Sequence, residues 1–306
     1  MPPPPVTAAA AGTWTLAGRT IHRMGFGSMH ITASPDRDLA ITVLRRAVEL
    51  GVNHIDTAAF YFSPGGPLDV GSGPTRYATE LIREALSPYP NDLVIATKVG
   101  PGYDPVTGAF LQAKTPAALR AQVEENLRRL GRDHLDVVNL RILKRPGSDS
   151  VAERFGALAE LRDAGLIRHL GLSNVRLDHV DEAAAIAPVA CVQNSYALDN
   201  GRANDALLEA CGERGIAFVP YFAIAGARRE GGAGTDHDEA VREVARAHGV
   251  TPHQVRLAWT LHQGPHVLAI PGTGDPDHLV ENIAAGALRL SPGEVARLDA
   301  LVVEDA

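Results

Sequence analysis

Eight short runs of apolar and β-branched residues constrain the fold of this chain most strongly. Each run is continuous in its hydrophobicity, as in strands covered on both faces, and does not alternate as a half-exposed strand does. Helical patterns separate the runs, and strands and helices that alternate in this way predict a closed (β/α)8 TIM barrel of the α/β class. The runs are RMGFGSMHI, VNHIDTA, DLVIATKV, HLDVVNLRI, IRHLGLSN, VACVQNSY, IAFVPYFA and HVLAIPGT.

The chain ends and the helices complete this organisation. TWTLAGRTIHR is typical of a β-hairpin ahead of the first strand. Residues 1–12, rich in proline and alanine, are expected to form a disordered tail, and residues 13–306 a single barrel domain with extra C-terminal helices. Thr115, Thr251 and Ser291, each followed by proline, indicate helix starts. The helical patterns span 36–50, 75–87, 115–130, 151–164, 177–187, 202–214, 236–248, 252–262, 276–286 and 292–302.

Charge and composition argue against several kinds of partner. The net charge is -7, and no run of Lys or Arg offers a surface for nucleic acid or for an anionic membrane. No stretch of roughly 18 apolar residues occurs and no secretion signal is recognisable, so a cytoplasmic protein is expected. Cys191 and Cys211 predict reduced structural thiols. Because no HExxH or CxxC spacing occurs, no metal is expected.

Polar side chains stand at the ends of the predicted strands, where the active sites of such barrels lie. Asp56 ends the second strand in NHIDTAAFYF, Tyr61 follows in the same stretch, and Lys98 ends the third strand in VIATK. A lysine between an aspartate and a tyrosine would stabilise the phenolate, so that the tyrosine could deliver a proton near neutral pH. A strand-end salt bridge beside a packed aromatic ring would use the same residues. The spacing alone leaves both interpretations open.

Seven motifs in order make the chain resemble the aldo-keto reductases over residues 14–303. They are MGFGSM, NHIDTAAFY, ATK, GLSN, VQNSY, VPYFAIAG and IPGTGDPDHLVEN. The resemblance implies an NAD(P)H-dependent oxidoreductase that reduces a small-molecule aldehyde or ketone to the alcohol, by direct hydride transfer from the nicotinamide. Tyr61 would be the general acid, and Lys98 and Asp56 would tune it.

The same resemblance implies a set of cofactor-binding residues. Ser173, Asn174 and Gln193 would hydrogen-bond the nicotinamide carboxamide, and Tyr221 would stack on the nicotinamide ring. For Gly27, a tight turn is the alternative explanation. The other positions would hold the phosphates and the adenosine or line the cleft: Gly27, Ser28, Phe222, Ile224, Gly272, Thr273, His278 and Asn282.

The fourth member of the usual catalytic set departs from the family pattern. The family has a histidine at the end of the fourth strand, and this chain has Arg141 in DVVNLRIL. Either the site is impaired and the protein binds or senses a nucleotide, or the guanidinium donates to the carbonyl oxygen as a permanent cation. We favour the second interpretation because Asp56, Tyr61 and Lys98 are present. Arginine cannot shuttle a proton, so Tyr61 would have to be the proton donor.

The substrate expected from the resemblance is a hydroxylated pyridine aldehyde. LDVVNLRI, with NHIDTAAFY and CVQNSY, is most similar to the pyridoxal-reductase-like bacterial branch of the family. The Arg141 guanidinium would attract a phenolate beside the aldehyde. Simple core packing would also account for apolar side chains at strand ends, and Tyr103 could close over the substrate or be exposed. The candidates for an aromatic substrate pocket are Met29, Phe60, Phe62, Tyr103, Leu143 and Tyr196.

The cofactor is expected to be NADPH, with NADH as the alternative. Asp275 would repel a 2′-phosphate if it pointed inward, whereas Arg228 and Arg229 could fold over the cofactor and compensate. The rival functions are an NAD-dependent dehydrogenase that works towards oxidation and a nucleotide-binding regulatory subunit. The sequence does not indicate the oligomeric state.

Overall fold

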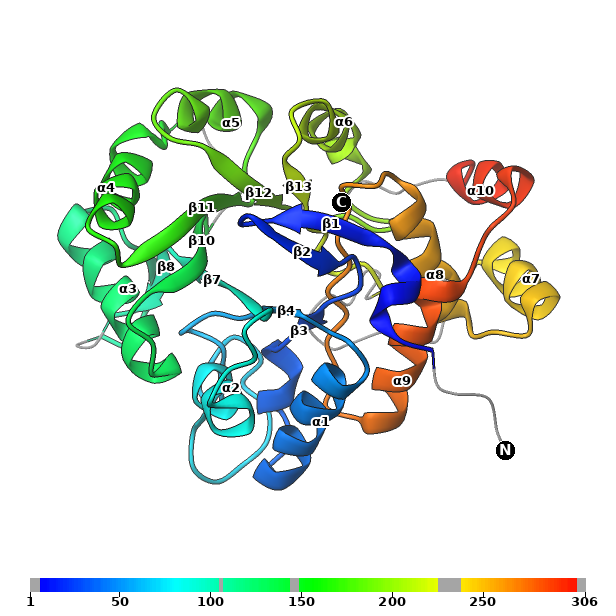
Figure 1. The fold of residues 1–306 in the computed structure, drawn as a ribbon, viewed down its shortest axis with the longest axis horizontal. Helices are drawn as coiled ribbons and strands as arrows, with labels where there is room; N and C mark the ends of the chain where they lie inside the picture. Colours follow the sequence, from blue (N-terminus) through cyan, green and yellow to red (C-terminus); the bar gives the residue numbers. More distant parts are fainter. Residues whose placement is uncertain (1–5, 105–106, 144–148, 225–237, 302–306) are drawn as a thin grey trace.

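The centre of the molecule is a curled parallel sheet, seen in a computed structural model that describes residues 6–104, 107–143, 149–224 and 238–301. Seven strands run in the order β13, β12, β11, β10, β7, β4, β3, and neighbouring strands are parallel. Figure 1 shows helices around this sheet. The strands are β3 Phe26–Gly27, β4 His54–Asp56, β7 Val94–Val99, β10 Leu135–Arg141, β11 Ile167–Ser173, β12 Val189–Gln193 and β13 Ala217–Phe218.

An eighth segment closes the barrel between the two edge strands. Phe218 of β13 forms a parallel bridge with Val267, and Ala269 forms another with Met24, just before β3. The last of the eight predicted runs therefore takes the expected place. The predicted (β/α)8 barrel is confirmed, with its closing strand reduced to isolated bridges.

Two glycines allow the closing segment to approach β3. A Cβ on Gly27 would lie 2.6 Å from the carbonyl oxygen of Ile270, and a Cβ on Gly272 would lie 2.3 Å from the carbonyl oxygen of Gly27. Side-chain atoms do not come this close to backbone, so a larger residue at either position would push β3 and the closing segment apart. Close backbone approach, and not a tight turn, therefore explains Gly27.

The helices follow the predicted order. Thr115, Thr251 and Ser291 cap α3, α8 and α10, each accepting a hydrogen bond from a backbone N–H of the first turn. Helices α7 and α10 pack on α8 at the outside of the barrel (Figure 1). The helices are α1 Arg37–Glu49, α2 Ala78–Leu86, α3 Pro116–Leu130, α4 Ala152–Asp163, α5 Leu177–Ala184, α6 Asp205–Glu213, α7 Glu239–His248, α8 Pro252–His262, α9 Pro276–Ala284 and α10 Pro292–Asp299. None of these described helices is long and apolar enough to cross a membrane.

The predicted N-terminal hairpin, β1 Thr13–Leu16 with β2 Arg19–His22, covers the N-terminal end of the barrel. Leu16 and Ile21 of the hairpin are buried against the barrel interior. The hairpin thus seals the end of the barrel that is opposite to the predicted site. The interior residues in this cluster are Val94, Val137, Cys191, Ala217, Val219 and Leu268.

The predicted disordered tail of residues 1–12 is too long. Residues Ala8–Ala11 form a 3-10 helix, η1, in which Ala8 and Ala11 are buried. This helix packs on η5 (Ala285–Ala287), where a Cβ on Gly286 would lie 2.9 Å from the Cβ of Ala11. Small side chains are required at such a contact, so the alanine run belongs to the barrel. Residues 1–5 lie outside the described residues.

The long loops after β4 and β7 contain two short antiparallel pairs that the sequence did not predict. The first joins β5 Phe62–Ser63 to β6 Arg76–Tyr77, and the second joins β8 Pro101–Tyr103 to β9 Phe110–Gln112. Both follow the C-terminal ends of barrel strands, as does the 3-10 helix η2 Met29–Thr32 after β3. Structured loops therefore surround the region in which the site was predicted.

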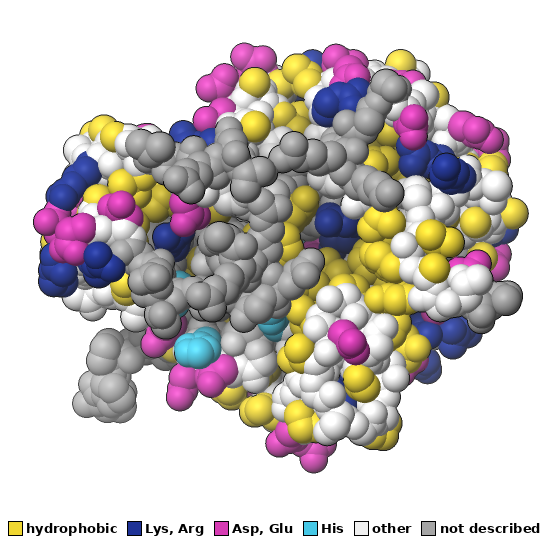
Figure 2. Space-filling model, turned by 180° about the vertical axis from the view of Figure 1, so that it is seen from behind, with side chains coloured by type: hydrophobic (Ala, Val, Ile, Leu, Met, Phe, Trp, Pro, Cys, Tyr) yellow, Lys and Arg dark blue, Asp and Glu magenta, His cyan; other side chains and the backbone are white. Residues whose placement is uncertain are grey.

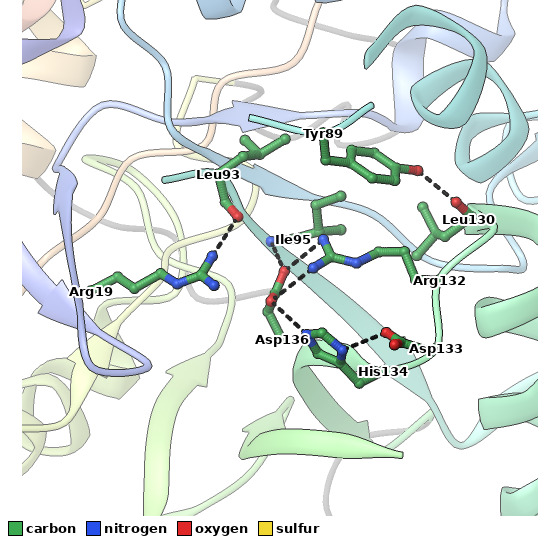
Figure 3. Close-up of polar contacts among 9 residues, drawn as sticks. All are labelled: Arg19, Tyr89, Leu93, Ile95, Leu130, Arg132, Asp133, His134 and Asp136. Atoms are coloured by element: carbon green, nitrogen blue, oxygen red, sulfur yellow. Dashed lines mark hydrogen bonds and ion pairs between the residues drawn. The ribbon is translucent and has the colours of Figure 1, made fainter. Parts of the chain in front are cut away.

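A polar cluster joins β7 and β10 at the N-terminal end of the barrel (Figure 3). The guanidinium of Arg132 donates to both carboxylate oxygens of Asp136, at 3.0 and 3.2 Å. The backbone N–H of Ile95 donates to the same carboxylate at 3.0 Å. Arg132 also lies 5.1 Å from the centre of the Tyr89 ring. The cluster thus fastens the segment after α3 to the adjoining strands.

Candidate active site

Predicted site residues stand at the C-terminal ends of six barrel strands, with Gly27 at the end of β3 and Ser173 at the end of β11. Asp56 ends β4, Lys98 lies one residue before the end of β7, Arg141 ends β10 and Gln193 ends β12. Because the strands are parallel, these ends meet on one side of the barrel. Figure 2, seen from the side opposite to Figure 1, shows a hollow there that is bordered by hydrophobic side chains and has a basic side chain at its floor.

Asp56 and Lys98 form a buried ion pair at this end of the barrel. Lys98 Nζ lies 2.5 Å from Asp56 Oδ1 and donates to the carbonyl oxygen of Thr57 at 3.0 Å. The Lys98 side chain is 1% exposed and that of Asp56 6%. Lys98 Nζ is also 4.7 Å from the centre of the Tyr61 ring. The structure therefore brings the three predicted residues together, with the lysine between the other two.

Two opposing effects act on the charge of Lys98. Burial disfavours the ammonium form, whereas the Asp56 carboxylate and the Tyr61 phenol stabilise it. The stabilising contacts prevail, and the pKa of Lys98 is raised above its usual value. Lys98 is therefore a fixed cation beside Tyr61 at neutral pH.

Arg141 ends β10, where the resemblance predicts a histidine. Its Nη1 donates to Ser173 Oγ at 2.9 Å, and its guanidinium carbon lies 4.9 Å from the centre of the Tyr221 ring. Within the described part of the chain, no carboxylate forms an ion pair with Arg141. The guanidinium therefore keeps N–H donors and an uncompensated charge at the cavity wall.

Gln193 links the ion pair to the cavity. Its Nε2 donates to Asp56 Oδ2 at 2.8 Å, which orients the amide. Gln193 Oε1 and Ser28 Oγ are buried atoms with no hydrogen-bond partner among the described residues. Unsatisfied buried polar atoms are rare in proteins, and Gln193 and Ser28 both line one cavity, so these two atoms indicate a place for a polar ligand group.

One cavity of about 800 Å³ extends from Asp56 and Tyr61 to the N-terminus of α9. It is of the size that holds a cofactor or a drug-sized ligand. Segments that are far apart in the sequence contribute to its wall, as the motifs predicted. The predicted site residues that line it are Gly27, Ser28, Met29, Asp56, Phe60, Tyr61, Arg141, Leu143, Gln193, Tyr221, Phe222, Ile224, Gly272, Thr273, His278 and Asn282.

Ser173 and Asn174 are not among the residues that line this cavity. Ser173 is fully buried and holds Arg141, while the Asn174 amide donates to the carbonyl oxygen of Ile142 at 2.8 Å. The Tyr221 hydroxyl donates to Asn174 Oδ1 at 3.5 Å. These contacts support Arg141 and Tyr221 from behind. A contact of Ser173 and Asn174 with a nicotinamide carboxamide stays a prediction.

The structure corrects the placement of Phe62 and Tyr103. Both line a second cavity of about 180 Å³, together with Lys98. Their rings lie 5.0 Å apart, and the Tyr103 ring lies 4.8 Å from that of Phe110, which does line the main cavity. Aromatic packing therefore holds Phe62 and Tyr103 one layer behind the predicted substrate pocket.

Of the two interpretations left open for Tyr196, pocket wall or core packing, the structure supports core packing. It is 1% exposed, and its ring is stacked on Trp259 with centroids 5.7 Å apart. Its hydroxyl donates to Asp205 at 2.6 Å. Tyr196 is therefore a core residue between the sheet and α8 with a satisfied hydroxyl, and Trp259 beside it is fully buried.

Asp275 directs its carboxylate to the N-terminus of α9. One oxygen accepts hydrogen bonds from the backbone N–H groups of Asp277 and His278, at 2.8 and 3.2 Å. These bonds lower the pKa of Asp275. The residue still borders the cavity and adds negative charge there. Arg228 and Arg229, expected to offset that charge, lie outside the described residues.

The sequence reasoning missed several residues of the cavity wall: His30, Phe110, His253 and Glu281. Phe110 belongs to β9, and its ring lies 5.6 Å from that of Phe60. His30 lies in η2, just after Ser28 and Met29 in the chain. Burial lowers the pKa of His30. The only available signal was the closeness of His30 to Ser28 and Met29 in the chain. Phe110 lies in a loop whose strand pairing carried no such signal.

Comparisons with known proteins identify relatives of this chain. Pyridoxine 4-dehydrogenase of Escherichia coli (strain K12) is 42% identical, over 95% of this chain and 99% of that protein. An uncharacterised oxidoreductase of Schizosaccharomyces pombe is 37% identical, over 96% of this chain and 91% of that protein.

A solved structure and a family profile extend the comparison. The crystal structure of an aldo-keto reductase from Klebsiella pneumoniae in complex with NADPH has a TM-score of 0.76 and 28% identity, over 94% of this chain and 93% of that one. The sequence model of the Aldo/keto reductase family matches residues 23–303. The chain therefore belongs to the aldo/keto reductase family of oxidoreductases.

Proposed function

We propose that this protein is an NADPH-dependent reductase that converts an aromatic aldehyde, such as pyridoxal, to the alcohol, with Tyr61 as proton donor. The observation that carries the proposal is the buried Lys98, held between Asp56 and Tyr61, both of which line the 800 Å³ cavity. A buried charge persists only where its partners stabilise it, and such arrangements concentrate at functional sites.

The cavity offers groups that fit a nicotinamide nucleotide. A carboxamide has both a donor and an acceptor, which suit the unpartnered Gln193 Oε1 and Ser28 Oγ. When bound, the nucleotide supplies the hydride to the carbonyl carbon. Tyr221 would pack against the nicotinamide ring. The residues that would hold the rest of the nucleotide are Gly27, Phe222, Ile224, Gly272, Thr273, His278 and Asn282.

Tyr61 holds the proton that the reaction requires at its phenolic oxygen. Transfer of that proton leaves a phenolate, which the neighbouring Lys98 cation stabilises. Asp56 keeps Lys98 charged and in place, because its carboxylate is fixed on the other side by Gln193. General acid catalysis of this kind is worth about 10²- to 10⁴-fold in rate.

Arg141 would polarise the carbonyl group and select the substrate. Its N–H donors border the cavity, and a guanidinium is a stronger, permanent donor than neutral imidazole. Oxygen anions beside the aldehyde, such as the phenolate of a hydroxypyridine, would be favoured by the same charge. Phe60 and Phe110 supply an aromatic wall against which a planar ring can pack. The name of the Escherichia coli relative supports a substrate of this class.

The choice of nucleotide rests on the solved relative that contains NADPH. Asp275 acts against this choice only weakly, because its carboxylate is committed to capping α9. The Escherichia coli relative is named as a dehydrogenase, which makes alcohol oxidation the second candidate direction.

The test is to mix the purified protein with pyridoxal and to follow the loss of reduced-nicotinamide absorbance, with NADPH and NADH in parallel. Faster consumption of NADPH is expected. The reverse reaction, with pyridoxine and each oxidised nucleotide, measures the preferred direction. Nucleotide binding in a titration without turnover on pyridoxal or on a panel of other carbonyls would overturn the proposal and favour a nucleotide-binding subunit.

A further inference from the structure

A single side-chain amide in the loop after β7 holds the segment that carries Arg141. Gln112 Nε2 donates to the carbonyl oxygen of Arg141 at 3.1 Å, and the backbone N–H of Leu143 donates to Gln112 Oε1 at 2.7 Å. Gln112 ends β9, far from these residues in sequence. Its carboxamide therefore uses its donor and its acceptor on either side of one residue, Ile142.

The remaining backbone groups of this segment are also held. The N–H of Ile142 donates to the carbonyl oxygen of Ser173 at 3.0 Å, and its carbonyl oxygen accepts from the Asn174 amide at 2.8 Å. Asn174 and Ser173 come from the end of β11, whereas Gln112 comes from the loop hairpin. The backbone that follows Arg141 is thus fixed on one side by β9 and on the other by the end of β11.

The local backbone leaves room for the glutamine. Gly100 has a φ of +117°, and a Cβ at that position would lie 2.3 Å from the carbonyl oxygen of Arg141 and 2.7 Å from Gln112 Nε2. No other residue type adopts this conformation without strain or fits this space. The approach of Gln112 to Arg141 therefore depends on a glycine just after β7.

The hairpin that bears Gln112 also bears part of the cavity wall. Phe110, two residues earlier on β9, lines the main cavity and contacts the Phe60 ring. Successive residues of a strand point to opposite faces, so Phe110 and Gln112 share one face of β9. One strand thus presents both an aromatic contact for a substrate and the clamp on Arg141.

We infer that Gln112 is a positioning residue for the carbonyl-polarising arginine. It fixes the base of Arg141 relative to the aromatic wall, so that a ring packed on Phe110 has its carbonyl oxygen within reach of the guanidinium. The inference rests on the role proposed for Arg141. Only a side chain with one donor and one acceptor at the length of glutamine makes both bonds, since glutamate lacks the donor and methionine lacks both.

Two variants of Gln112 and one matched control test the inference. Gln112→Glu keeps the acceptor for Leu143 and sets an anionic oxygen against the Arg141 carbonyl, while Gln112→Met removes both bonds at similar length. The control is Gln122→Met, because Gln122 accepts from the Gly100 N–H at 2.7 Å and donates to the Pro101 carbonyl at 3.2 Å. Gln122 therefore clamps the same hairpin without touching the segment of Arg141.

Both Gln112 variants should lower kcat for pyridoxal by roughly tenfold, since small misplacements of a catalytic group are known to have effects of up to about 100-fold. The affinity for NADPH, measured by fluorescence titration, should stay unchanged, because Gln112 does not line the main cavity. Gln122→Met should lower the melting temperature at least as much as Gln112→Met and should leave kcat close to that of the natural protein. Equal losses of kcat in the two methionine variants would overturn the inference, because general loosening of the hairpin would then explain them.

A double-mutant cycle with Arg141→Met separates this inference from the proposed function. If Gln112 acts through Arg141, Gln112→Met should have no further effect on kcat in the Arg141→Met protein. Additive losses would mean that Gln112 acts independently, and the inference would fail while the role of Arg141 stands. An Arg141→Met protein with the kcat of the natural protein would instead show that the proposed role of Arg141 is wrong.

Discussion

Two buried ion pairs lie at opposite ends of the barrel, and they differ in nearly every contact. At the N-terminal end Asp136 pairs with Arg132, four residues earlier, and at the C-terminal end Asp56 pairs with Lys98, 42 residues later. The two aspartates are equally buried, each with 4% of its surface exposed. Burial and charge alone therefore do not distinguish a structural pair from a catalytic one.

The neighbours of each pair make the distinction. The Asp136 carboxylate accepts two hydrogen bonds from the Arg132 guanidinium and one from a backbone N–H (Figure 3). We call this pair closed because its carboxylate oxygens are already bonded within the protein. The Asp56 pair adjoins a phenol and two buried oxygens without a partner among the described residues, Thr57 Oγ1 and Gln193 Oε1. A closed pair has nothing left to offer a ligand, whereas an open one has both a charge and unused polar atoms.

The two cations also suit different tasks. Arginine has a planar fork that matches a carboxylate in two bonds, which fixes geometry. Lysine presents a compact charge with three donors, which can serve a carboxylate, a carbonyl and a phenol at once. The catalytic assignment of Lys98 and the structural assignment of Arg132 make opposite predictions for variants at the two ends.

The largest difference is expected from removal of the phenol beside the catalytic pair. Tyr61→Phe should lower turnover by about 10²- to 10⁴-fold, because the proton donor is lost. Nucleotide affinity should be close to unchanged, since the aromatic ring remains. Steady-state reduction of pyridoxal and a nucleotide titration measure the two quantities.

Tyr89→Phe is the matched control, because the Tyr89 ring lies beside Arg132 as the Tyr61 ring lies beside Lys98. That substitution removes only the hydrogen bond from the hydroxyl to the Leu130 carbonyl. Turnover should be retained in Tyr89→Phe. Substantial activity in Tyr61→Phe would refute the proton-donor assignment and remove the main difference between the two ends.

The second difference is expected between Asp56→Asn and Asp136→Asn. Each substitution leaves a cation without its carboxylate, the buried Lys98 or the half-buried Arg132, so each should lower the free energy of unfolding, by up to about 3 kcal/mol. Only Asp56→Asn should also lower turnover, because only Lys98 adjoins the proton donor. Denaturant unfolding and turnover at a temperature where both variants are folded give the two readings. Loss of turnover in folded Asp136→Asn would show that the N-terminal pair is not merely structural.

A smaller effect is expected at Arg141, which has no ion-pair partner within the described residues. Arg141→His should retain reduction of simple aldehydes and lose roughly tenfold in kcat/KM for phenolic or anionic ones, the size of one hydrogen bond to a charged group. A series of substituted benzaldehydes with and without an acidic hydroxyl measures this selectivity. Equal losses for all of them would mean that Arg141 does not select the substrate.

The grouping of Asp56, Tyr61 and Lys98 was predictable because its signal is local. Asp56 and Tyr61 stand in one motif, and Lys98 ends a strand whose apolar pattern is plain, so the strand order brings them together. The helix starts at Thr115, Thr251 and Ser291 were equally local, because a cap depends on the residues just after it.

The residues whose positions the sequence did not predict share a different cause. Tyr196 and Phe62 are aromatic residues, which occur both in pocket walls and in protein cores. Long-range packing decides in which of the two they lie. The clamp from Gln112 to Arg141 joins a polar side chain to distant backbone and has no periodicity in the sequence. The buried alanines of η1 were hidden because a short alanine run has no amphipathic pattern, and their contact with η5 closes over almost the whole chain.

The smallest expected effect is a difference between Lys98 and Arg132 in how their contribution to stability depends on pH. The pKa of Lys98 is raised above its ordinary value of 10.5, so its pairing contributes stability that is fully present below pH 10.5 and is lost as the pH rises through the folded-state pKa. Arginine keeps its charge throughout this range. The difference in unfolding free energy between the natural protein and Lys98→Met should therefore shrink above pH 10.5, while the corresponding difference for Arg132→Met stays constant. Urea unfolding at pH 7, 9, 10 and 11 measures both, and a Lys98 difference that stayed as constant as that of Arg132 would show that contacts other than its charge account for the stability of the catalytic pair.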